Sequence, residues 1–189
     1  MIGAGQIIRA SWIAFIVYWT VTGFQQRAVA ERVPWFTQLA HKLPVGFGAW
    51  LMIFPLWDHR LWNPLLPFSQ PVFPWLGAAL CVIGVAGAIW ARWTLAGNWN
   101  SNVVFKQGHE LIERGPYRFV RHPIYTSLLV MGLGTALAEN RLSGFAGVFF
   151  WFVGFWIKLR QEEKLLTRHF AAEYPAYMTR VKALIPFVL

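Results

Sequence analysis

The sequence has 189 residues, of which 57% are hydrophobic and only 13% are charged. A soluble domain carries about 25% charged residues, so this composition indicates an integral membrane protein. The net charge of +9 does not favour a nucleic-acid partner, because the basic residues alternate with apolar segments instead of covering a soluble surface. The length suits a single domain over residues 1–189.

Metal and hydrolase chemistry are not expected. Cys81, the only cysteine, lies within an apolar segment, which excludes a disulfide framework and a cysteine metal site. The five histidines show no metal-ligand spacing. A Ser-His-Asp hydrolase is equally unexpected, because Asp58 is the only aspartate and falls on the side of the membrane opposite to the other polar groups.

Five apolar segments are predicted as membrane-spanning helices: residues 7–24, 43–57, 72–91, 124–138 and 142–157. The first contains Arg9, and a signal peptide cleaved near residues 28–30 is the alternative. The second is short, which leaves a re-entrant or tilted helix open. The third has no charge, and its Gly77, Gly84 and Gly87 predict close helix packing.

The connecting segments complete this outline. Residues 25–42 are predicted as a polar connector, 58–71 as a Pro-rich loop and 92–121 as a long polar loop. Only residues 139–141 separate the last two spans, which predicts a tight helical hairpin. The tail, residues 158–189, is expected to continue the fifth helix and then to lie on the membrane surface.

The basic residues predict the orientation in the membrane. With five spans, 14 of the 17 lysines and arginines fall on one side, and only Arg9, Arg60 and Arg141 fall on the other. The positive-inside rule then places the N-terminus outside and puts the long loop and the tail together in the cytoplasm.

A polar stretch, residues 114–125, directly precedes the fourth apolar segment. Pro123 suits the first turn of a helix, which is expected to run to Ala138. Arg121, His122 and Tyr125 then lie at the mouth of a membrane helix, where Arg and His are costly unless they face a cavity, a partner or a ligand. The alternative is a basic anchor whose side chains reach the membrane surface.

A second polar cluster follows the fifth span. Lys158 and Glu162 are four residues apart and share one side of a helix, whereas Glu163 points about 100° away. These charges could simply be solvated, but two clusters on one membrane face favour a small-molecule site. The Glu162 carboxylate can hold an ammonium group or ribose hydroxyls, and Tyr117 and Tyr125 can face a sulfonium cation. S-adenosylmethionine carries all of these groups, although residue spacing alone does not identify it as the ligand.

A longer ordered pattern runs through the second half of the chain: Gly115-Pro116-Tyr117-x-x-x-Arg121-His122-Pro123-x-Tyr125, then a helical hairpin, Glu162-Glu163, and Phe170-x-x-x-Tyr174-x-x-Tyr177-x-x-Arg180-Val181. From about residue 92 onward, the chain resembles the isoprenylcysteine carboxyl methyltransferase family, which is related to the phospholipid methyltransferases. The short chain is similar to prokaryotic members. We therefore expect a multi-pass protein of a prokaryotic inner membrane.

The resemblance implies an all-α membrane enzyme with about five transmembrane helices. Its cytoplasmic S-adenosylmethionine site is formed by the loop before the fourth helix and by the C-terminal tail. Residues 1–91 would supply three spans and residues 92–189 the catalytic half. The implied cofactor-binding residues are Asn102, His109, Glu110, Leu111, Ile112, Tyr117, His122, Pro123, Ile124, Tyr125 and Glu162.

The acceptor side is assigned less directly. Its basic residue falls on Lys158, where eukaryotic members have Arg, and Arg160 is the substitute. A carboxylate acceptor needs no base, but an amine or thiol would, with Glu163 or His109 as candidates. The implied catalytic set is therefore Lys158, Arg160 and Glu163. A second departure is Ser127, where the family usually has Gly.

The implied function is methyl transfer to a lipophilic acceptor, in first place a carboxylate of a prenylcysteine-like molecule. The acceptor is expected to enter from the bilayer along Trp93, Trp99 and the third span, so membrane lipids are also partners. N-methylation of an aminophospholipid and a non-catalytic scaffold remain alternatives. The sequence does not predict an oligomeric state.

Overall fold

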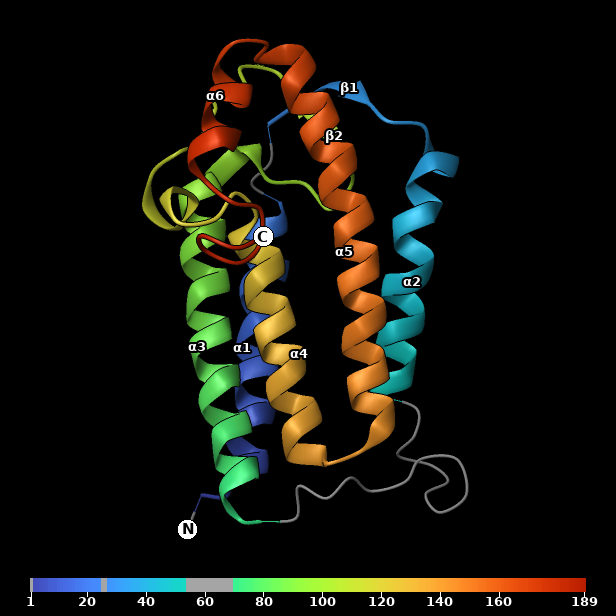
Figure 1. Ribbon diagram of the computed structural model, residues 1–189, viewed down its shortest axis with the longest axis vertical. Coiled ribbons are helices and arrows are strands. Elements are labelled where there is room, and N and C mark those ends of the chain that lie inside the picture. Colours follow the sequence, from blue (N-terminus) through green and yellow to red (C-terminus); the bar gives the residue numbers. More distant parts are fainter. Residues whose placement is uncertain (1, 25–26, 54–69) are drawn as a thin grey trace.

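The computed structural model describes residues 2–24, 27–53 and 70–189. These residues form long helices that alternate in direction along one axis (Figure 1): α1 (Ala4–Gly23), α2 (Trp35–Ile53), α3 (Val72–Leu95), α4 (Pro123–Glu139) and α5 (Leu142–His169). Shorter elements gather at the end opposite to the N-terminus: β1 (Val29–Arg32), the 3-10 helices η2 (Ala96–Asn98) and η3 (Gly115–Arg118), β2 (Val104–Lys106) and α6 (Glu173–Arg180). Of the predicted Pro-rich loop, residues 58–71, residues 58–69 lie outside the described residues.

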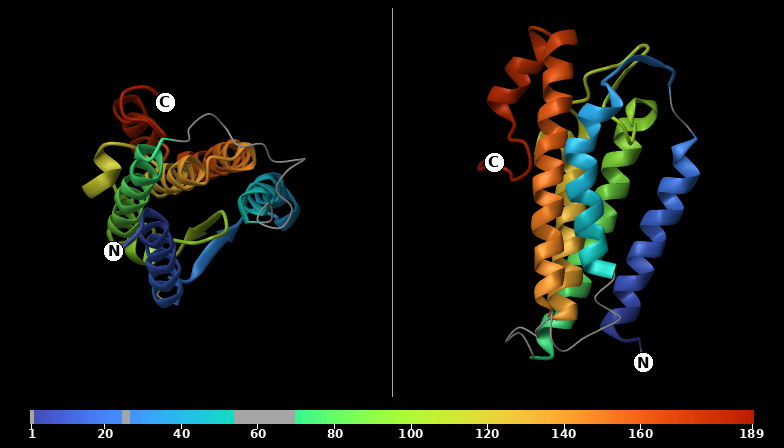
Figure 2. Two further views of the ribbon diagram at one scale, coloured as in Figure 1. Left: turned by 90° about the horizontal axis from the view of Figure 1, so that it is seen from below. Right: turned by 90° about the vertical axis from the view of Figure 1, so that its right-hand side faces the viewer.

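The helices pack in two groups, visible in Figure 2. Helix α3 packs on α4 and α1, while α5 packs on α2 and joins the two groups through α4. Helices α1, α3 and α5 are long and apolar enough to cross a membrane. Large apolar side chains, such as Ile13, Ile83 and Phe149, are exposed on the outside of the bundle. The chain is therefore an integral membrane protein, and the count of five spans stays a prediction.

Glycines bring helix backbones together at both main interfaces. A Cβ atom on Gly77 would lie 2.3 Å from the Gly134 carbonyl oxygen of α4, and one on Gly48 of α2 would lie 2.6 Å from that of Gly147 on α5. The close packing predicted from the glycines of α3 is thus confirmed. A Cβ on Gly87 would lie 2.8 Å from the Ser127 hydroxyl oxygen, so Gly87 supplies the space that serine occupies at the position where the family usually has glycine.

Two local predictions are confirmed. Pro123 opens α4, and the helix ends at Glu139, one residue beyond the predicted end. Asn140 adopts the left-handed conformation (φ 55°) that commonly ends a helix, and α5 begins two residues later at Leu142. Helix α5 then runs through the predicted end of the fifth span to His169.

The predicted boundary between the connector 25–42 and the second span is wrong, because α2 already begins at Trp35. The first turns of α2 expose Trp35 and Phe36 and bury Gln38 and His41. This polarity is the reverse of that in a soluble helix, since a helix in a bilayer turns its apolar side chains to lipid. Gln38 and His41 therefore face the bundle, although polar residues at these positions indicated a connector in the sequence.

A small sheet was not predicted. Strands β1 and β2 pair antiparallel, with Glu31 opposite Phe105, and the suggested cleavage region around residues 28–30 runs into β1. In the part of the chain that the structure describes, all other regular elements are helices, in agreement with the predicted all-α class.

The prediction that the end of the tail lies on the membrane surface stays a prediction, but residues 181–184 also pack against the protein itself. The backbone N–H groups of Arg121 and His122 donate to the carbonyls of Lys182 and Ala183 at 2.8 and 3.0 Å. Leu184 is 2% exposed and accepts a hydrogen bond from the Thr126 hydroxyl. This segment therefore returns to the start of α4.

The α3–α4 contact yields a stability prediction. We expect Gly77→Ala to destabilise the protein by about 1–3 kcal/mol or more, because the added methyl would collide with backbone and force the helices apart. Thermal unfolding in detergent measures this loss. The control is Gly46→Ala on α2, where nothing lies within 4 Å of the added Cβ. Equal melting temperatures for the two variants would show that the helix contact is looser than described.

Candidate functional site

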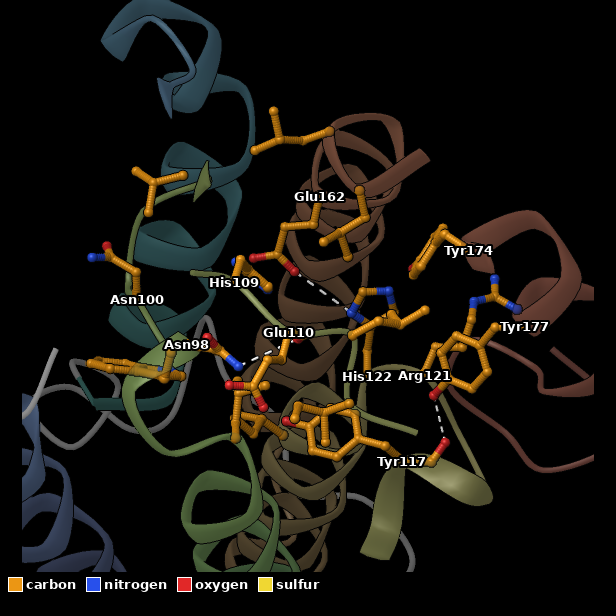
Figure 3. A pocket seen from close by; sticks show the side chains of 18 of the residues that line it. Asn98, Asn100, His109, Glu110, Tyr117, Arg121, His122, Glu162, Tyr174 and Tyr177 are labelled. Atoms are coloured by element: carbon orange, nitrogen blue, oxygen red, sulfur yellow. Dashed lines mark hydrogen bonds and ion pairs between the residues drawn. The ribbon is translucent and has the colours of Figure 1, made fainter. Parts of the chain in front are cut away.

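One cavity lies at the end of the bundle that carries the sheet and α6. Its empty space, including the open mouth, is about 850 Å³. The wall is built from the end of α3, the loop to α4, η3, the start of α4, the C-terminal part of α5, and α6. Figure 3 shows the polar side chains of these elements pointing toward one another.

Most of the predicted cofactor residues line this cavity: His109, Glu110, Leu111, Ile112, Tyr117, His122, Ile124, Tyr125 and Glu162. Asn102 and Pro123 do not line it, nor does any member of the predicted catalytic set, Lys158, Arg160 and Glu163. Trp99 also lines it, whereas Trp93 is 73% exposed outside it. The functional roles of all these residues stay predictions.

Glu162 is the acidic side chain of α5 that reaches the cavity. Its Oε1 accepts a hydrogen bond from the Tyr125 hydroxyl at 2.7 Å, and its Oε2 lies 3.6 Å from His122 Nδ1 (Figure 3). The rings of His122 and Tyr125 stack with centroids 5.5 Å apart. A carboxylate and aromatic faces thus form one wall, which suits a ligand that carries a positive charge.

Glu163, the next residue, has different surroundings. Its Oε1 accepts hydrogen bonds from Arg121 Nε at 2.9 Å and Arg121 Nη2 at 2.6 Å, and lies 3.3 Å from His122 Nε2. Its Oε2 lies 3.8 Å from Arg160 Nη1. Glu163 is 4% exposed. A carboxylate held in this way serves as a structural counter-ion, and its location does not favour the predicted role as a base.

Arg121 extends this network to the tail. Its Nη1 donates to the carbonyl oxygens of Met178 and Val181. The tail helix α6 is further fixed by the Tyr177 hydroxyl, which donates to the Tyr117 carbonyl. The guanidinium of Arg121 thus joins the start of α4, α5 and the tail at the floor of the cavity.

Arg121 lines the cavity, as expected for an arginine at the mouth of a membrane helix. The predicted site residues do not include four other polar lining residues: Asn98, Asn100, Tyr174 and Tyr177. Tyr174 and Tyr177 are three residues apart and both buried, a spacing that puts them on one helix face. That spacing, which lies within the family pattern, was the available signal. For Asn98 and Asn100 the signal was two amides at the end of an apolar span.

Arg27 was also missed, because it lies in the connector between α1 and α2. Its Nη1 donates to Asn98 Oδ1 at 3.3 Å and to the Gly108 carbonyl, and its Nη2 lies 3.0 Å from Glu110 Oε1. Its backbone N–H donates to the Gly97 carbonyl at 3.1 Å. Arg27 therefore holds two parts of the α3–α4 loop, and two cavity-lining residues, in place.

His109 lies in the loop outside the helices. Its ring stacks on Phe105 with centroids 4.8 Å apart, and its Nδ1 accepts a hydrogen bond from the Lys106 backbone N–H at 3.4 Å. Burial, with a smaller effect of the nearby Arg27 cation, lowers the pKa of His109 to about 4. The imidazole is therefore neutral at physiological pH.

This lowered pKa predicts a pH dependence of stability. In the unfolded chain the histidine pKa is about 6.5. Below that pH the unfolded chain binds a proton at His109, whereas the folded protein keeps this imidazole neutral down to about pH 4. The stabilisation is thus complete above about pH 6.5 and is lost as the pH falls through about 4. We expect the melting temperature to drop more steeply between pH 7 and pH 4 in the wild type than in His109→Gln. Parallel curves would contradict this pKa.

Comparison with known proteins gives the family. A family model described as phospholipid methyltransferase matches residues 72–173. The protein-S-isoprenylcysteine O-methyltransferase of Saccharomyces cerevisiae is 33% identical over 116 residues, 60% of this chain and 48% of that protein. The uncharacterized protein YpbQ of Bacillus subtilis is 34% identical over 67 residues, 35% of this chain and 40% of that protein. The matched chain thus spans about half the length of these relatives or less.

The fold has a counterpart among solved structures. The eukaryotic intramembrane Ras methyltransferase ICMT (isoprenylcysteine carboxyl methyltransferase) has a TM-score of 0.55 and 23% identity, over 78% of this chain and 52% of that chain. This likeness concerns the fold alone. Because the family model covers more than half of the sequence, the chain belongs to the phospholipid methyltransferase family, and its relatives include isoprenylcysteine methyltransferases, as the sequence resemblance predicted.

Proposed function

We propose that this protein transfers a methyl group from S-adenosylmethionine to a lipophilic acceptor at the membrane, with a carboxylate of a prenylcysteine-like molecule as the accepting group. The observation that carries the proposal is the position of Glu162, whose carboxylate lines the cavity beside Tyr125 and Tyr117. The names of the relatives support methyl transfer.

The residues present fit S-adenosylmethionine. When bound, this cofactor supplies an electrophilic methyl group on a positively charged sulfur. The Glu162 carboxylate would hold its ammonium group or ribose hydroxyls, and the aromatic faces of Tyr117 and Tyr125 would favour its positive charge. Asn98, whose amide donates to the Glu110 carbonyl at 3.4 Å, would order the loop that closes over the cofactor.

The remaining work of the protein is to align the acceptor and to exclude water. Tyr117, Ile124 and His122 are at most 8% exposed, so this part of the wall is shielded from solvent. A carboxylate acceptor is ionised at neutral pH and needs no base. A reaction without a base agrees with the two candidates for that role: Glu163 lies outside the cavity lining, and His109, with a pKa of about 4, is a weak base.

The second candidate is N-methylation of an aminophospholipid, which the description of the matching family favours. An amine acceptor must lose a proton before or during attack. Glu162 and Glu110 are the carboxylates that line the cavity and would then be the groups to take it. Incubation of the purified protein with S-adenosylmethionine and either a prenylcysteine or phosphatidylethanolamine, with detection of the methylated product, separates the two candidates.

The adjacent glutamates provide a matched pair of variants. We expect Glu162→Gln to weaken binding of S-adenosylmethionine by about 1–3 kcal/mol, with little loss of stability, since the amide oxygen can still accept from Tyr125. We expect Glu163→Gln to lower the stability by about 3–5 kcal/mol, because Arg121 would become a buried charge without its partner.

Calorimetric titration with S-adenosylmethionine and S-adenosylhomocysteine, together with thermal unfolding, measures both effects. A wild-type protein that folds but binds neither compound would refute the proposed function and favour a non-catalytic scaffold. If Glu163→Gln abolished binding without destabilising the protein, the roles assigned to the two glutamates would be exchanged.

A further inference from the structure

Two lysines from different helices meet on one turn beside the cavity. Lys158 Nζ of α5 donates to the Ser101 carbonyl oxygen at 2.7 Å. Lys42 Nζ of α2 donates to Asn102 Oδ1 at 2.9 Å. Because Ser101 and Asn102 are consecutive, the two ammonium groups bind the same short turn.

This turn borders the cavity. Asn102 donates its backbone N–H to Asn100 Oδ1 at 2.8 Å, and Asn100 lines the cavity on the side that faces α2 (Figure 3). Lys158 Nζ lies 5.4 Å from the centroid of the Tyr125 ring and 4.0 Å from Glu162 Oε1. The lysine pair is thus next to the wall on which the proposed cofactor site depends.

The positions of the two lysines are fixed by contacts between α2 and α5. His41, which is 3% exposed, binds Gln161 through its Nδ1 at 2.9 Å. Gln161 in turn donates to the Thr37 carbonyl at 2.9 Å. These contacts hold α2 at His41 against α5 at Gln161. The backbone positions of Lys42 and Lys158 are therefore fixed relative to each other.

The charges of this pair are only partly balanced. Lys158 lies near Glu162, which the proposed function assigns to the cofactor, and its side chain is only 11% exposed. Among the described residues, no carboxylate lies within 4 Å of Lys42 Nζ. Both lysines otherwise bind neutral oxygens, and an anion would add a Coulombic attraction to both ammonium groups that these neutral acceptors do not supply. An anion that reaches this turn would therefore displace the neutral acceptors.

The family resemblance already implies an acceptor-side role for Lys158, and we propose that Lys42 joins it, so that the two lysines hold an anionic group of the acceptor, a carboxylate or a phosphate, on the α2–α5 side of the cavity. The proposal rests on the proposed function, because it assumes that an acceptor binds beside the cofactor. It gives a binding role to Lys42, which lies outside the stretch that matches the family model, residues 72–173.

The test measures acceptor binding to the detergent-purified protein in the presence of S-adenosylhomocysteine. The two probes with an anionic group, called the anionic probes, are an N-acetylated farnesylcysteine with a free carboxylate and phosphatidylethanolamine in mixed micelles, which is zwitterionic and carries a phosphate. The control probe is the uncharged carboxamide of the farnesylcysteine. The variants are Lys42→Met, Lys42→Arg and the control Lys164→Met, which removes an exposed lysine of α5 that faces away from this turn. The affinity for S-adenosylhomocysteine is measured for each variant.

We expect Lys42→Met to weaken binding of the anionic probe by about tenfold, while Lys42→Arg stays within about threefold of wild type. The carboxamide should bind wild type and Lys42→Met alike, and Lys164→Met should behave as wild type. The probe that responds identifies the anion as a carboxylate or as a lipid phosphate.

Three results would overturn the proposal: an unchanged affinity of Lys42→Met for the anionic probes, an equal loss for the carboxylate and the carboxamide, or a wild type that binds neither anionic probe. A change in S-adenosylhomocysteine affinity alone would overturn it too, by assigning Lys42 to the cofactor. A wild type that binds S-adenosylhomocysteine but neither anionic probe would also refute the proposed acceptors, whereas in the other cases the proposed function stands as long as the wild type binds S-adenosylhomocysteine. Loss of that binding in the wild type would instead refute the proposed function.

Discussion

The ion pair between Arg121 and Glu163 is the constraint on which the cavity depends. Both side chains are at most 8% exposed, and the contact measures 2.6 Å. A buried carboxylate without a cation is costly, so Glu163 requires the guanidinium, and the guanidinium in turn satisfies carbonyls of the tail. The start of α4, the far end of α5 and the C-terminal segment are therefore fixed together by a single cluster of charges.

The geometry of α5 directs Glu162 and Glu163 to different surroundings. Successive residues of an α-helix differ in direction by about 100°, so Glu162 and Glu163 cannot face the same surroundings. Glu163 turns to Arg121 and the tail, whereas Glu162 turns to Tyr125 and the cavity. His122 lies between them, with one ring nitrogen near each carboxylate. Two adjacent acidic residues thus serve as a support and as a wall of the cavity.

The sequence predicted those parts of the fold in which local rules and burial agree. The apolar runs, the helix start at Pro123 and the turn at Asn140 depend on lipid solubility and backbone conformation, which neighbouring residues determine. The start of α2 could not be predicted in this way, because His41 and Gln38 are buried by partners on other segments. The pairing of β1 with β2 joins residues more than 70 positions apart, and nothing local specifies it.

The candidate site was predictable to the extent that it resembles a family pattern. That pattern lies in the second half of the chain, and it identified Tyr117, His122, Tyr125 and Glu162 as residues that the structure indeed brings to one cavity. It could not identify Arg27 or Lys42, whose contacts with the α3–α4 loop arise only when the connector before α2 and the first turns of α2 lie against that loop. Arg27 contacts that loop at its start, Gly97, and in its middle, Glu110, and Lys42 contacts it in between. The first half of the chain is therefore part of the site and not only a membrane anchor: cutting between α2 and α3 would leave the cavity without one of its supporting sides.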